Sequence, residues 1–304
     1  NAETETYVRS VIASTDQHPE SGTLIEEIKT LFQDVIANPA LAKDVDPICR
    51  GPFGMARIEL KDGARPASKA PFRTLGERED AMKVIIQKYL DRGWIVPTKS
   101  EWAAQAFVVP KPPNPDKPRE KQWRMAVDYR YQNSQTKDDS FPLPLIEDLI
   151  VKQSKNRLWS IFDLEDGFHQ MHLDPDSQHL TAFVTSSGAY QFTVLPMGIK
   201  NGPAMFQRMI QWILKDLDFV PVYIDDVLVG TPDLGTPLRL HLLHVKNILS
   251  TFRECRLAVK GSKMHLFMTM VKFCGHLLFN GQRKAAKSKL EAIEKWTPDM
   301  IKTL

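Results

Sequence analysis

Two carboxylates, Asp225 and Asp226, stand side by side in the apolar segment FVPVYIDDVLVG, residues 219–230. The neighbouring residues predict buried strand, where an uncompensated charge is costly. An Asp pair between two short apolar runs can be the polar tip of a β-hairpin, because Asp tolerates turn geometry. The pair can instead hold a divalent cation, which removes the cost of the charge. A third carboxylate nearby would favour the metal.

Asp163 is the candidate for that third carboxylate. The segment RLWSIFD, 157–163, alternates like a strand and ends at Asp163, which places this side chain at the rim of the predicted sheet. Taken alone, such an Asp is more often a helix cap or a turn residue. If adjacent strands carry Asp163 and Asp225, however, they can hold two Mg²⁺ ions for phosphoryl transfer, one activating the attacking oxygen and one stabilising the leaving group.

Histidine and cysteine give weaker signals. Two histidine pairs have short spacing: His169/His172 and His241/His244. No Cys or acidic ligand pattern accompanies them, so we do not expect zinc. The three cysteines are widely spaced and lack a C-x-x-C pattern: Cys49, Cys255 and Cys274. They imply neither a disulfide framework nor a zinc site and fit a reducing, intracellular setting.

The composition is that of an ordinary soluble protein with one large or two ordinary domains: 304 residues, 42% hydrophobic and 25% charged. A formal net charge of +3 does not by itself indicate a nucleic-acid partner. No apolar run is long enough for a membrane span and no signal-peptide pattern opens the chain, so we expect no membrane association. The first residue is Asn1, which suggests a processed product or an excised fragment.

Helices and strands interleave along the chain. Apolar residues at helical spacing predict helices over 24–36, 76–93, 201–217 and 241–256. Strands are predicted over 55–60, 94–98, 103–110, 123–129, 157–163 and 189–196, with hairpins at 103–129, 219–230 and 271–282. The order lacks the regular βαβα rhythm of a doubly wound sheet. It favours an α+β fold with an antiparallel sheet.

Several blocks in one order carry a family resemblance: WRMAVDYR (123–130), FPLPLIEDL (141–149), IFDLEDGFHQMHL (161–173), TAFVTSSGAYQFTVLPMGIKNGPAMFQRMI (181–210), VYIDDVLV (222–229) and VKFCGHLL (271–278). Together they resemble the reverse transcriptase of gypsy-type LTR retrotransposons, a relative of the retroviral enzymes. Y-x-D-D alone would be a weak signal, whereas the ordered series over roughly residues 50–300 is specific.

The resemblance implies a right-hand polymerase fold, with fingers, an antiparallel palm sheet flanked by helices, and the start of a thumb. It divides the chain into a linker or flexible N-terminus (1–23), N-terminal helices and mostly fingers (24–160), mostly palm (161–270), and a primer-grip hairpin with the start of the thumb (271–304). The chain ends where relatives continue into a thumb, a connection and an RNase H domain. We therefore expect no RNA-strand degradation.

The implied activity is RNA-directed DNA polymerisation, a nucleotidyl transfer within an LTR retrotransposon Pol polyprotein. A primer 3′-hydroxyl attacks the α-phosphorus of a dNTP and pyrophosphate leaves. Asp163, Asp225 and Asp226 occupy the positions of the family's catalytic, metal-binding triad. The resemblance makes Asp163 and Asp225 direct ligands of two Mg²⁺ ions, with Mn²⁺ as a substitute, and gives Asp226 the smallest share of the coordination.

The resemblance also implies a dNTP-binding set: Lys111, Arg124, Asp166, Gly167, Phe168 and Met197. Arg offers a planar fork to phosphate oxygens and Lys a mobile point charge. The proline-rich loop 111–118 is longer than is usual in the family, so Lys117 or Lys121 can take the place of Lys111, and all these lysines can also be simply solvated.

Phe168 matches an aromatic that lies beneath the sugar and collides with a 2′-hydroxyl; most gypsy-type elements have Tyr there. The alternative is an ordinary core aromatic. Met197 stands where relatives have Gln or Phe, and it packs either against the base pair or in the core.

The FCGH turn resembles the primer grip: Phe273, Cys274, Gly275 and His276. Beyond it, four basic residues can follow duplex phosphates or form a solvated helix face: Arg283, Lys284, Lys287 and Lys289.

The expected partners are an RNA or DNA template, a DNA or RNA primer and dNTPs, with a second subunit or a polyprotein-derived thumb, connection and RNase H as further partners. The expected location is a cytoplasmic virus-like particle or the nucleus. One alternative is a non-catalytic polymerase-fold subunit that binds nucleic acid or serves a structural role. Another is a metal-dependent nuclease.

Overall fold

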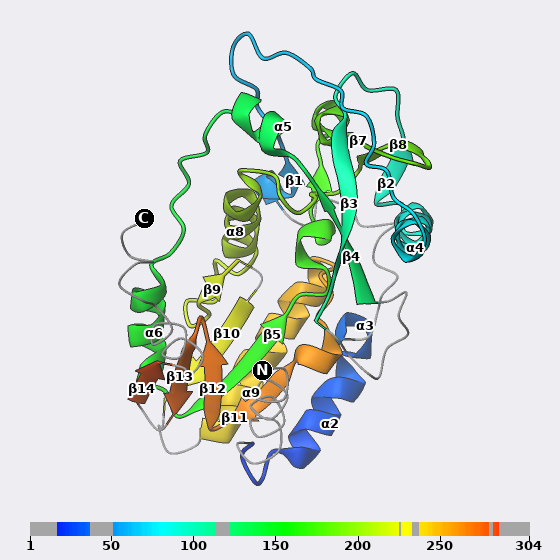
Figure 1. Cartoon of the computed structure of the whole chain (residues 1–304). Coiled ribbons are helices and arrows are strands. Elements are labelled where there is room, and N and C mark those ends of the chain that lie inside the picture. The colour runs from blue at the N-terminus through cyan, green and yellow to red at the C-terminus, as the bar shows by residue number, and fades with distance from the viewer. Residues whose placement is uncertain are drawn as a thin grey trace, which may run out of the picture.

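The computed structural model describes residues 17–36, 51–112, 122–224, 226–232, 237–279 and 282–285, and these form an α+β fold (Figure 1). Within that part of the chain, the α-helices are α2 (Gly22–Leu31), α3 (Gln33–Ile36), α4 (Glu77–Asp91), α5 (Arg130–Gln135), α6 (Ile146–Ser154), α7 (Pro175–Gln178), α8 (Gly202–Ile213) and α9 (Pro237–Glu254). None of them is long and apolar enough to cross a membrane.

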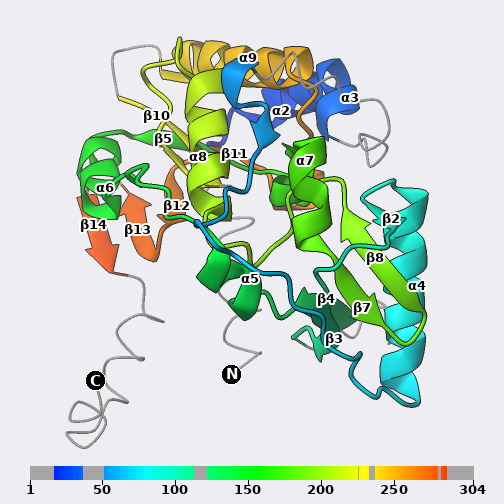
Figure 2. The same ribbon diagram turned by 90° about the horizontal axis from the view of Figure 1, so that it is seen from above.

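One antiparallel sheet carries the predicted acidic residues. In the described part of the chain it has four strands in the order β11 (His265–Met268), β5 (Leu158–Asp163), β10 (Asp226–Thr231) and β9 (Val222–Tyr223). Val227, Leu228 and Val229 are fully buried, which explains the apolar run beside the Asp pair. Helix α9 packs against β5 and β10, and Figure 2 shows α2 and α3 beside it.

Alternation along β5 and β10 divides their side chains between two cores. Leu158, Phe162, Val227 and Val229 join the main core, which also takes in α8 and α9. The opposite face of the sheet forms a second core: Ile150, Trp159, Leu228, Val271, Phe273 and Leu278. Because side chains alternate between the faces of a strand, Asp163 and Asp226 belong to the second face.

A second sheet forms the upper part of the molecule in Figure 1. Its described strands run in the order β2 (Ile95–Pro97), β8 (Gly188–Phe192), β7 (Phe183–Thr185), β3 (Ala104–Pro110) and β4 (Trp123–Val127). Helix α4 packs against β2, β3 and β4. The β3–β4 pairing confirms the predicted hairpin over 103–129.

Two smaller sheets complete the described fold. β12 (Met270–Phe273), β13 (His276–Phe279) and β14 (Gln282–Ala285) form an antiparallel sheet, against which α6 packs. β1 (Met55–Ala56) pairs in parallel with β6 (His172–Leu173). The predicted hairpin over 271–282 is confirmed by the β12–β13 pairing.

The N-terminal segment packs against the C-terminal strand of the first sheet. Gln17 forms a bridge with Met268, and the backbone N–H of His18 donates to the carbonyl of Phe267 at 2.8 Å. Arg253 of α9 forms an ion pair with Asp34 of α3 at 2.6 Å. Residues 17–18 therefore lie along β11, and α3 is joined to α9 by an ion pair.

Several predicted boundaries differ from the structure. The helix predicted over 24–36 divides into α2 and α3 at Phe32, and the one predicted from 241 begins at Pro237, a residue well suited to a first helical turn. Residues 55–60 pair as a strand only over Met55–Ala56, because the partner β6 is equally short. The strand predicted over 189–196 ends at Phe192, since Val194 pairs with His172 instead.

A buried hydrogen-bonded network joins α9 to the sheet. Both ring nitrogens of His241 are bonded, Nε2 to Ser160 Oγ at 2.7 Å and Nδ1 to Thr231 Oγ1 at 2.8 Å. The side chain is fully buried, and this burial, with a smaller contribution from His244, lowers the pKa of His241 to about 3. The neutral ring is thus the form that the fold accommodates.

This network predicts loss of stability in acid. Because the folded-state pKa of His241 lies below its ordinary value of 6.5, the unfolded chain takes up the proton first as the pH falls. Stability should be complete above about pH 6.5 and should then decline toward pH 3 by about 1.4 kcal/mol per pH unit from this group. Urea unfolding of the parent and His241→Gln at pH 7.5, 5.5 and 4.5 tests this. An equally steep acid decline in the variant would contradict it.

Candidate active site

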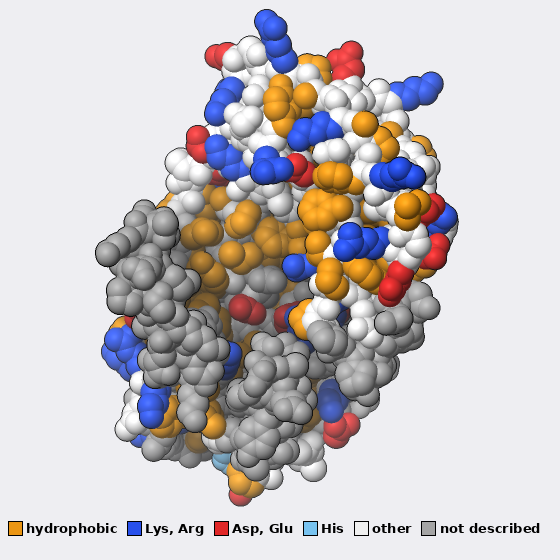
Figure 3. All heavy atoms as spheres, in the orientation of Figure 1, with side chains coloured by type: hydrophobic (Ala, Val, Ile, Leu, Met, Phe, Trp, Pro, Cys, Tyr) orange, Lys and Arg blue, Asp and Glu red, His pale blue; other side chains and the backbone are white. Residues whose placement is uncertain are grey.

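Asp163 and Asp226 lie directly opposite each other in the register of β5 and β10. Alternation places both side chains on one face, and like charges in this arrangement destabilise a sheet. In Figure 3, acidic side chains lie on the floor of a hollow, with hydrophobic side chains above them and Lys and Arg around its upper part. The hollow lies where Figure 1 shows the neighbouring ends of β5 and β10. The expected convergence of carboxylates from two strands is therefore present for Asp163 and Asp226.

Asp225 lies outside the described residues, and so do Lys117, Lys121, Lys287 and Lys289. In the described part of the chain, no group of three or more His, Cys, Asp or Glu side chains is arranged to hold a metal. The opposed pair Asp163 and Asp226 nevertheless fits Mg²⁺, since carboxylate oxygens are its usual protein ligands. Their separate shares in coordination stay a prediction.

Two lysines in the segment just before β11 form ion pairs with acidic residues at the end of β5 and just beyond it. Lys263 Nζ contacts the carboxylate of Asp163 at 2.6 Å, and Lys260 pairs with Glu165 at 3.1 Å. The backbone N–H of Lys260 also donates to the carbonyl of Asp163 at 2.8 Å. Positive charge thus stands beside the acidic pair. Sequence reasoning missed both lysines, because no local pattern indicates a contact across about 100 residues.

Asp166 lies near basic side chains at the C-terminal end of α4 and just beyond it. Its backbone is left-handed, with φ 48°, and its carboxylate pairs with Arg92 at 2.9 Å. Burial raises the pKa of Asp166, but Lys88, His169 and Arg92 outweigh it and hold the pKa below its ordinary value. Burial and the positive charge of Arg92 lower the pKa of Lys88, and the charge of Lys111 lowers it further. The predicted residues Asp166 and Lys111 therefore share one electrostatic neighbourhood.

Gly167 and Phe168 follow in the short 3₁₀ helix η3 (Gly167–Gln170). Phe168 is half-buried, and its ring lies 5.2 Å from that of Phe206 of α8. Gly202 of α8 faces the same ring, and a Cβ added there would come into van der Waals contact with it at 3.6 Å. The ring therefore packs against α8 through Phe206 and stays partly accessible. Its predicted contact with the sugar stays a prediction.

The predicted hairpin residues lie at the base of the loop between β3 and β4. Arg124 of β4 is the register partner of Val109, and the Lys111 N–H donates to the Gln122 carbonyl at 2.6 Å. Met197 is 64% exposed, which excludes the alternative that it packs in the core. The thioether precedes α8 in a loop and is available for contact.

The FCGH turn approaches the acidic pair from the side of the second core. Phe273 pairs with His276, and Cys274 and Gly275 between them have φ 45° and 78°. Burial, with a further contribution from the Asp226 carboxylate, raises the pKa of Cys274 to about 12. The predicted primer-grip turn and Asp226 are therefore close enough to interact.

Other predicted basic and histidine residues have structural partners. Arg283 of β14 pairs with Glu147 of α6 at 3.0 Å, and Lys284 is exposed in the same strand. For Arg283 and Lys284, the strand excludes the alternative of a solvated helix face. The His169 ring stacks on Trp94 at 4.3 Å, and burial lowers its pKa to about 4.

A groove of about 590 Å³ lies on the second sheet, between α4 and the loop before α8. Phe72 and Phe107 meet edge to face at 5.8 Å within its lining. Three arginines also line it: Arg73, Arg78 and Arg130. Aromatic faces beside arginines suit unpaired nucleic-acid bases and phosphates. The sequence analysis missed this groove because its walls come from separate segments.

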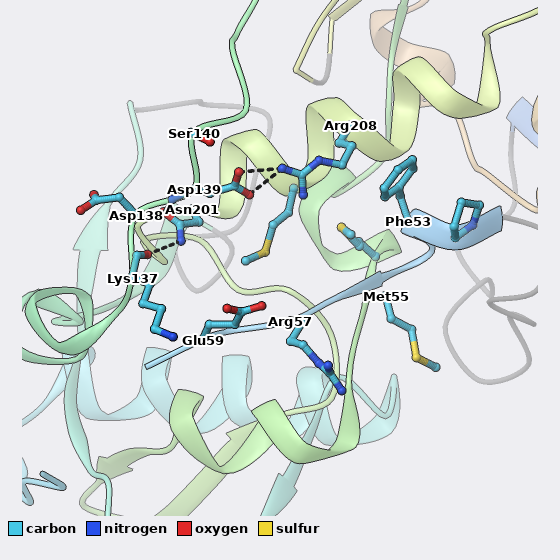
Figure 4. A pocket seen from close by; sticks show the side chains of 13 residues that line it. Phe53, Met55, Arg57, Glu59, Lys137, Asp138, Asp139, Ser140, Asn201 and Arg208 are labelled. Atoms are coloured by element: carbon cyan, nitrogen blue, oxygen red, sulfur yellow. Dashed lines mark hydrogen bonds and ion pairs between the residues drawn. The ribbon is translucent and has the colours of Figure 1, made fainter. Parts of the chain in front are cut away.

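Figure 4 shows a different pocket, about 400 Å³, between β1, α8 and the segment after α5. Arg208 holds the Asp139 carboxylate with bonds of 2.6 and 2.8 Å, and Asn201 donates to the Lys137 carbonyl at 2.8 Å. These groups satisfy one another. These bonds join α8 to the segment after α5. Neither Asp163 nor Asp226 lines this pocket.

Solved structures establish the class of fold. Foamy viral protease-reverse transcriptase in complex with an RNA/DNA hybrid matches 94% of this chain with a TM-score of 0.71 at 20% identity, over 36% of its own length. The same protein in complex with dsDNA matches 97% of this chain with a TM-score of 0.70 at 19% identity, over 58% of its length. The fold is that of the fingers and palm of a right-hand polymerase.

The family model described as reverse transcriptase (RNA-dependent DNA polymerase) matches residues 109–278, more than half of the chain. This chain belongs to the reverse transcriptase family. The Pol polyprotein from transposon opus of Drosophila melanogaster is 35% identical over 70% of this chain and 21% of the polyprotein. That from transposon 412 is 29% identical over 88% of this chain and 22% of the polyprotein. The chain thus spans about a fifth of these retrotransposon relatives.

Proposed function

We propose that this chain is the polymerase part of a Pol polyprotein and extends a primer 3′-hydroxyl with dNTPs on an RNA template. The observation that carries the proposal is the opposition of Asp163 and Asp226 on neighbouring strands of a polymerase fold. A scaffold gains nothing from opposed carboxylates, which destabilise the sheet that bears them. That argument favours catalysis over a non-catalytic subunit.

Asp163, Asp225 and Asp226 would hold two Mg²⁺ ions, for which Mn²⁺ would substitute. Bound there, the ions would activate the 3′-hydroxyl and stabilise charge on the leaving pyrophosphate. Arg124 and Lys111 would bind the triphosphate from the fingers hairpin, with Asp166 and Gly167 alongside it. These residues supply orientation and compensate charge, which are the main contributions to phosphoryl transfer.

The remaining residues would position the nucleic acid. Phe168 would exclude the 2′-hydroxyl of an rNTP, and Met197 would pack against the new base pair. The turn from Phe273 to His276 would press the primer end toward the acidic pair. The groove of Phe72 and Phe107 would hold the unpaired template, for which its arginines supply phosphate contacts.

The wider setting belongs to the same proposal. The relatives from Drosophila transposons fit the gypsy-type origin inferred from the sequence blocks. Other segments of a polyprotein, or a second subunit, would supply the thumb, connection and RNase H. The expected location is intracellular, in a virus-like particle or the nucleus.

Product analysis tests the activity. The chain is incubated with an RNA template, an end-labelled DNA primer, dNTPs and Mg²⁺, and the products are a longer primer and one pyrophosphate for each nucleotide added. Shortened strands would support a nuclease instead. Binding of the primer–template with no extension, at several protein and Mg²⁺ concentrations, would support the non-catalytic subunit.

A further inference from the structure

The turn between β9 and β10, which leads into Asp226, has an unfavourable backbone. Tyr223 of β9 pairs with Asp226 of β10, so only Ile224 and Asp225 lie between the paired residues. Ile224 has φ 57°, a left-handed conformation that β-branched residues rarely adopt. Hairpins this tight usually place Gly, Asn or Asp at such a position. The local sequence therefore does not favour the turn, and contacts from elsewhere must hold it.

Gln207 of α8 makes those contacts. Its Oε1 accepts a hydrogen bond from the backbone N–H of Ile224 at 2.6 Å, and its Nε2 donates to the carbonyl of Val222 at 3.1 Å. The side chain is fully buried, and both ends of its amide are satisfied by the turn. A buried amide that lost these partners would keep the cost of its desolvation. Both the Gln207 side chain and the turn are therefore stabilised by the pairing.

The two bonds reproduce the pattern of a neighbouring strand. β9 is the last strand of its sheet in the described part of the chain, so its outer edge lacks a strand partner there. Along a strand, the carbonyl of one residue and the N–H two residues later face the same side, and Gln207 bonds such a pair. One side-chain amide thus closes the edge at Ile224, two residues before Asp226.

We propose that Gln207 is a positioning residue that holds Ile224 in its left-handed conformation and thereby fixes Asp226 in its register opposite Asp163. This inference rests on the proposed polymerase function, because it assigns the acidic pair a metal-binding role. A purely structural role for Gln207 predicts only lower stability. The positioning role predicts in addition weaker metal binding and a looser turn.

The test compares Gln207→Met with Gln153→Met. Met keeps the length of Gln and removes both hydrogen-bonding groups. Gln153 of α6 is a suitable control because it is also buried and bonded: its Oε1 accepts a hydrogen bond from the Asn156 side chain at 2.9 Å, outside the turn that Gln207 bonds. Three quantities are measured: the Mg²⁺ concentration for half-maximal primer extension, Mn²⁺ binding by electron spin resonance, and amide exchange of a peptide covering residues 219–230.

For Gln207→Met we expect a roughly tenfold rise in half-saturating Mg²⁺, a matching loss of Mn²⁺ affinity, and faster exchange of the 219–230 peptide at unchanged primer–template affinity. Gln153→Met should lower the melting temperature without these effects. If Gln207→Met alters only the melting temperature, the proposal is overturned. Should it fail to fold, Gln207→Asn, which keeps the amide on a shorter side chain, is measured in the same way, with the same expected and overturning results.

A double variant tests the conformational part. Gly adopts the left-handed region without a steric penalty, so adding Ile224→Gly to Gln207→Met should recover part of the Mn²⁺ affinity. A double variant that binds Mn²⁺ no better than Gln207→Met overturns this part. Exchange and Mn²⁺ binding require no turnover, so they test Gln207 even if the parent chain does not extend primers, which would count against the proposed function alone.

Discussion

Changing Asp163 to Asn is expected to lower the rate of primer extension by about 10³-fold, roughly 4 kcal/mol in transition-state free energy. The amide keeps the shape of the side chain but loses the charge that would hold a divalent cation. Single-nucleotide extension at saturating dNTP and Mg²⁺ measures the loss. Asp216→Asn is the matched control, because Asp216 is exposed and belongs to neither strand.

Stability should respond in the opposite sense to activity. Asn at position 163 removes the repulsion from Asp226, while the lost ion pair with Lys263 is partly exposed and contributes little. The variant should therefore melt at the parent temperature or slightly above it. Normal extension by Asp163→Asn would refute the metal-ligand assignment. A large drop in melting temperature would instead make Asp163 a structural residue.

Changing Phe168 to Ala is expected to reduce the preference for dTTP over UTP by roughly 10- to 100-fold in the ratio of kcat/KM. The ring packs against Phe206 and lies close to Gly202, which leaves it little room to move away from a 2′-hydroxyl. Ala removes the obstacle and should raise kcat/KM for UTP more than it lowers that for dTTP. Steady-state insertion of each nucleotide opposite template adenine gives the ratio.

Phe168→Tyr is the control, since it retains the blocking plane and should retain the preference. If Phe168→Ala discriminates against UTP as well as the parent does, Phe168 is an ordinary packing residue. A loss of melting temperature without a change in the ratio leads to the same conclusion.

Local patterns predicted the elements that carry most of the site. Alternation in 157–163 located β5, and an apolar run interrupted by two Asp residues located the β9–β10 hairpin, because each signal lies within one strand or turn. Helix α6 was not predicted, since the prolines at 142 and 144 obscure the helical spacing that begins at Ile146. Strand β11 was missed because it becomes a strand only by pairing with β5.

The parts of the site that the sequence did not reveal are long-range contacts. Lys263 reaches Asp163 and Gln207 reaches Ile224 through side chains whose local sequence gives no sign of a partner. Register is similar: alternation placed Asp163 at a rim, but only the pairing of β5 with β10 sets Asp226 opposite it. Such information lies in the tertiary fold and not in any short segment.

The contact between the N-terminal segment and β11 has a consequence for how the chain folds. Gln17 forms a bridge with Met268, and β11 joins the sheet beside β5, so the sheet cannot be completed until the chain has been synthesised at least as far as Met268. The hydrophobic face of β5 must wait, partly exposed, for a strand that follows it by about 100 residues. The long loop must close, at a cost in chain entropy, before the stabilising contacts can form. This makes folding slow and favours aggregation of incomplete chains. Expression at low temperature should therefore raise the soluble yield.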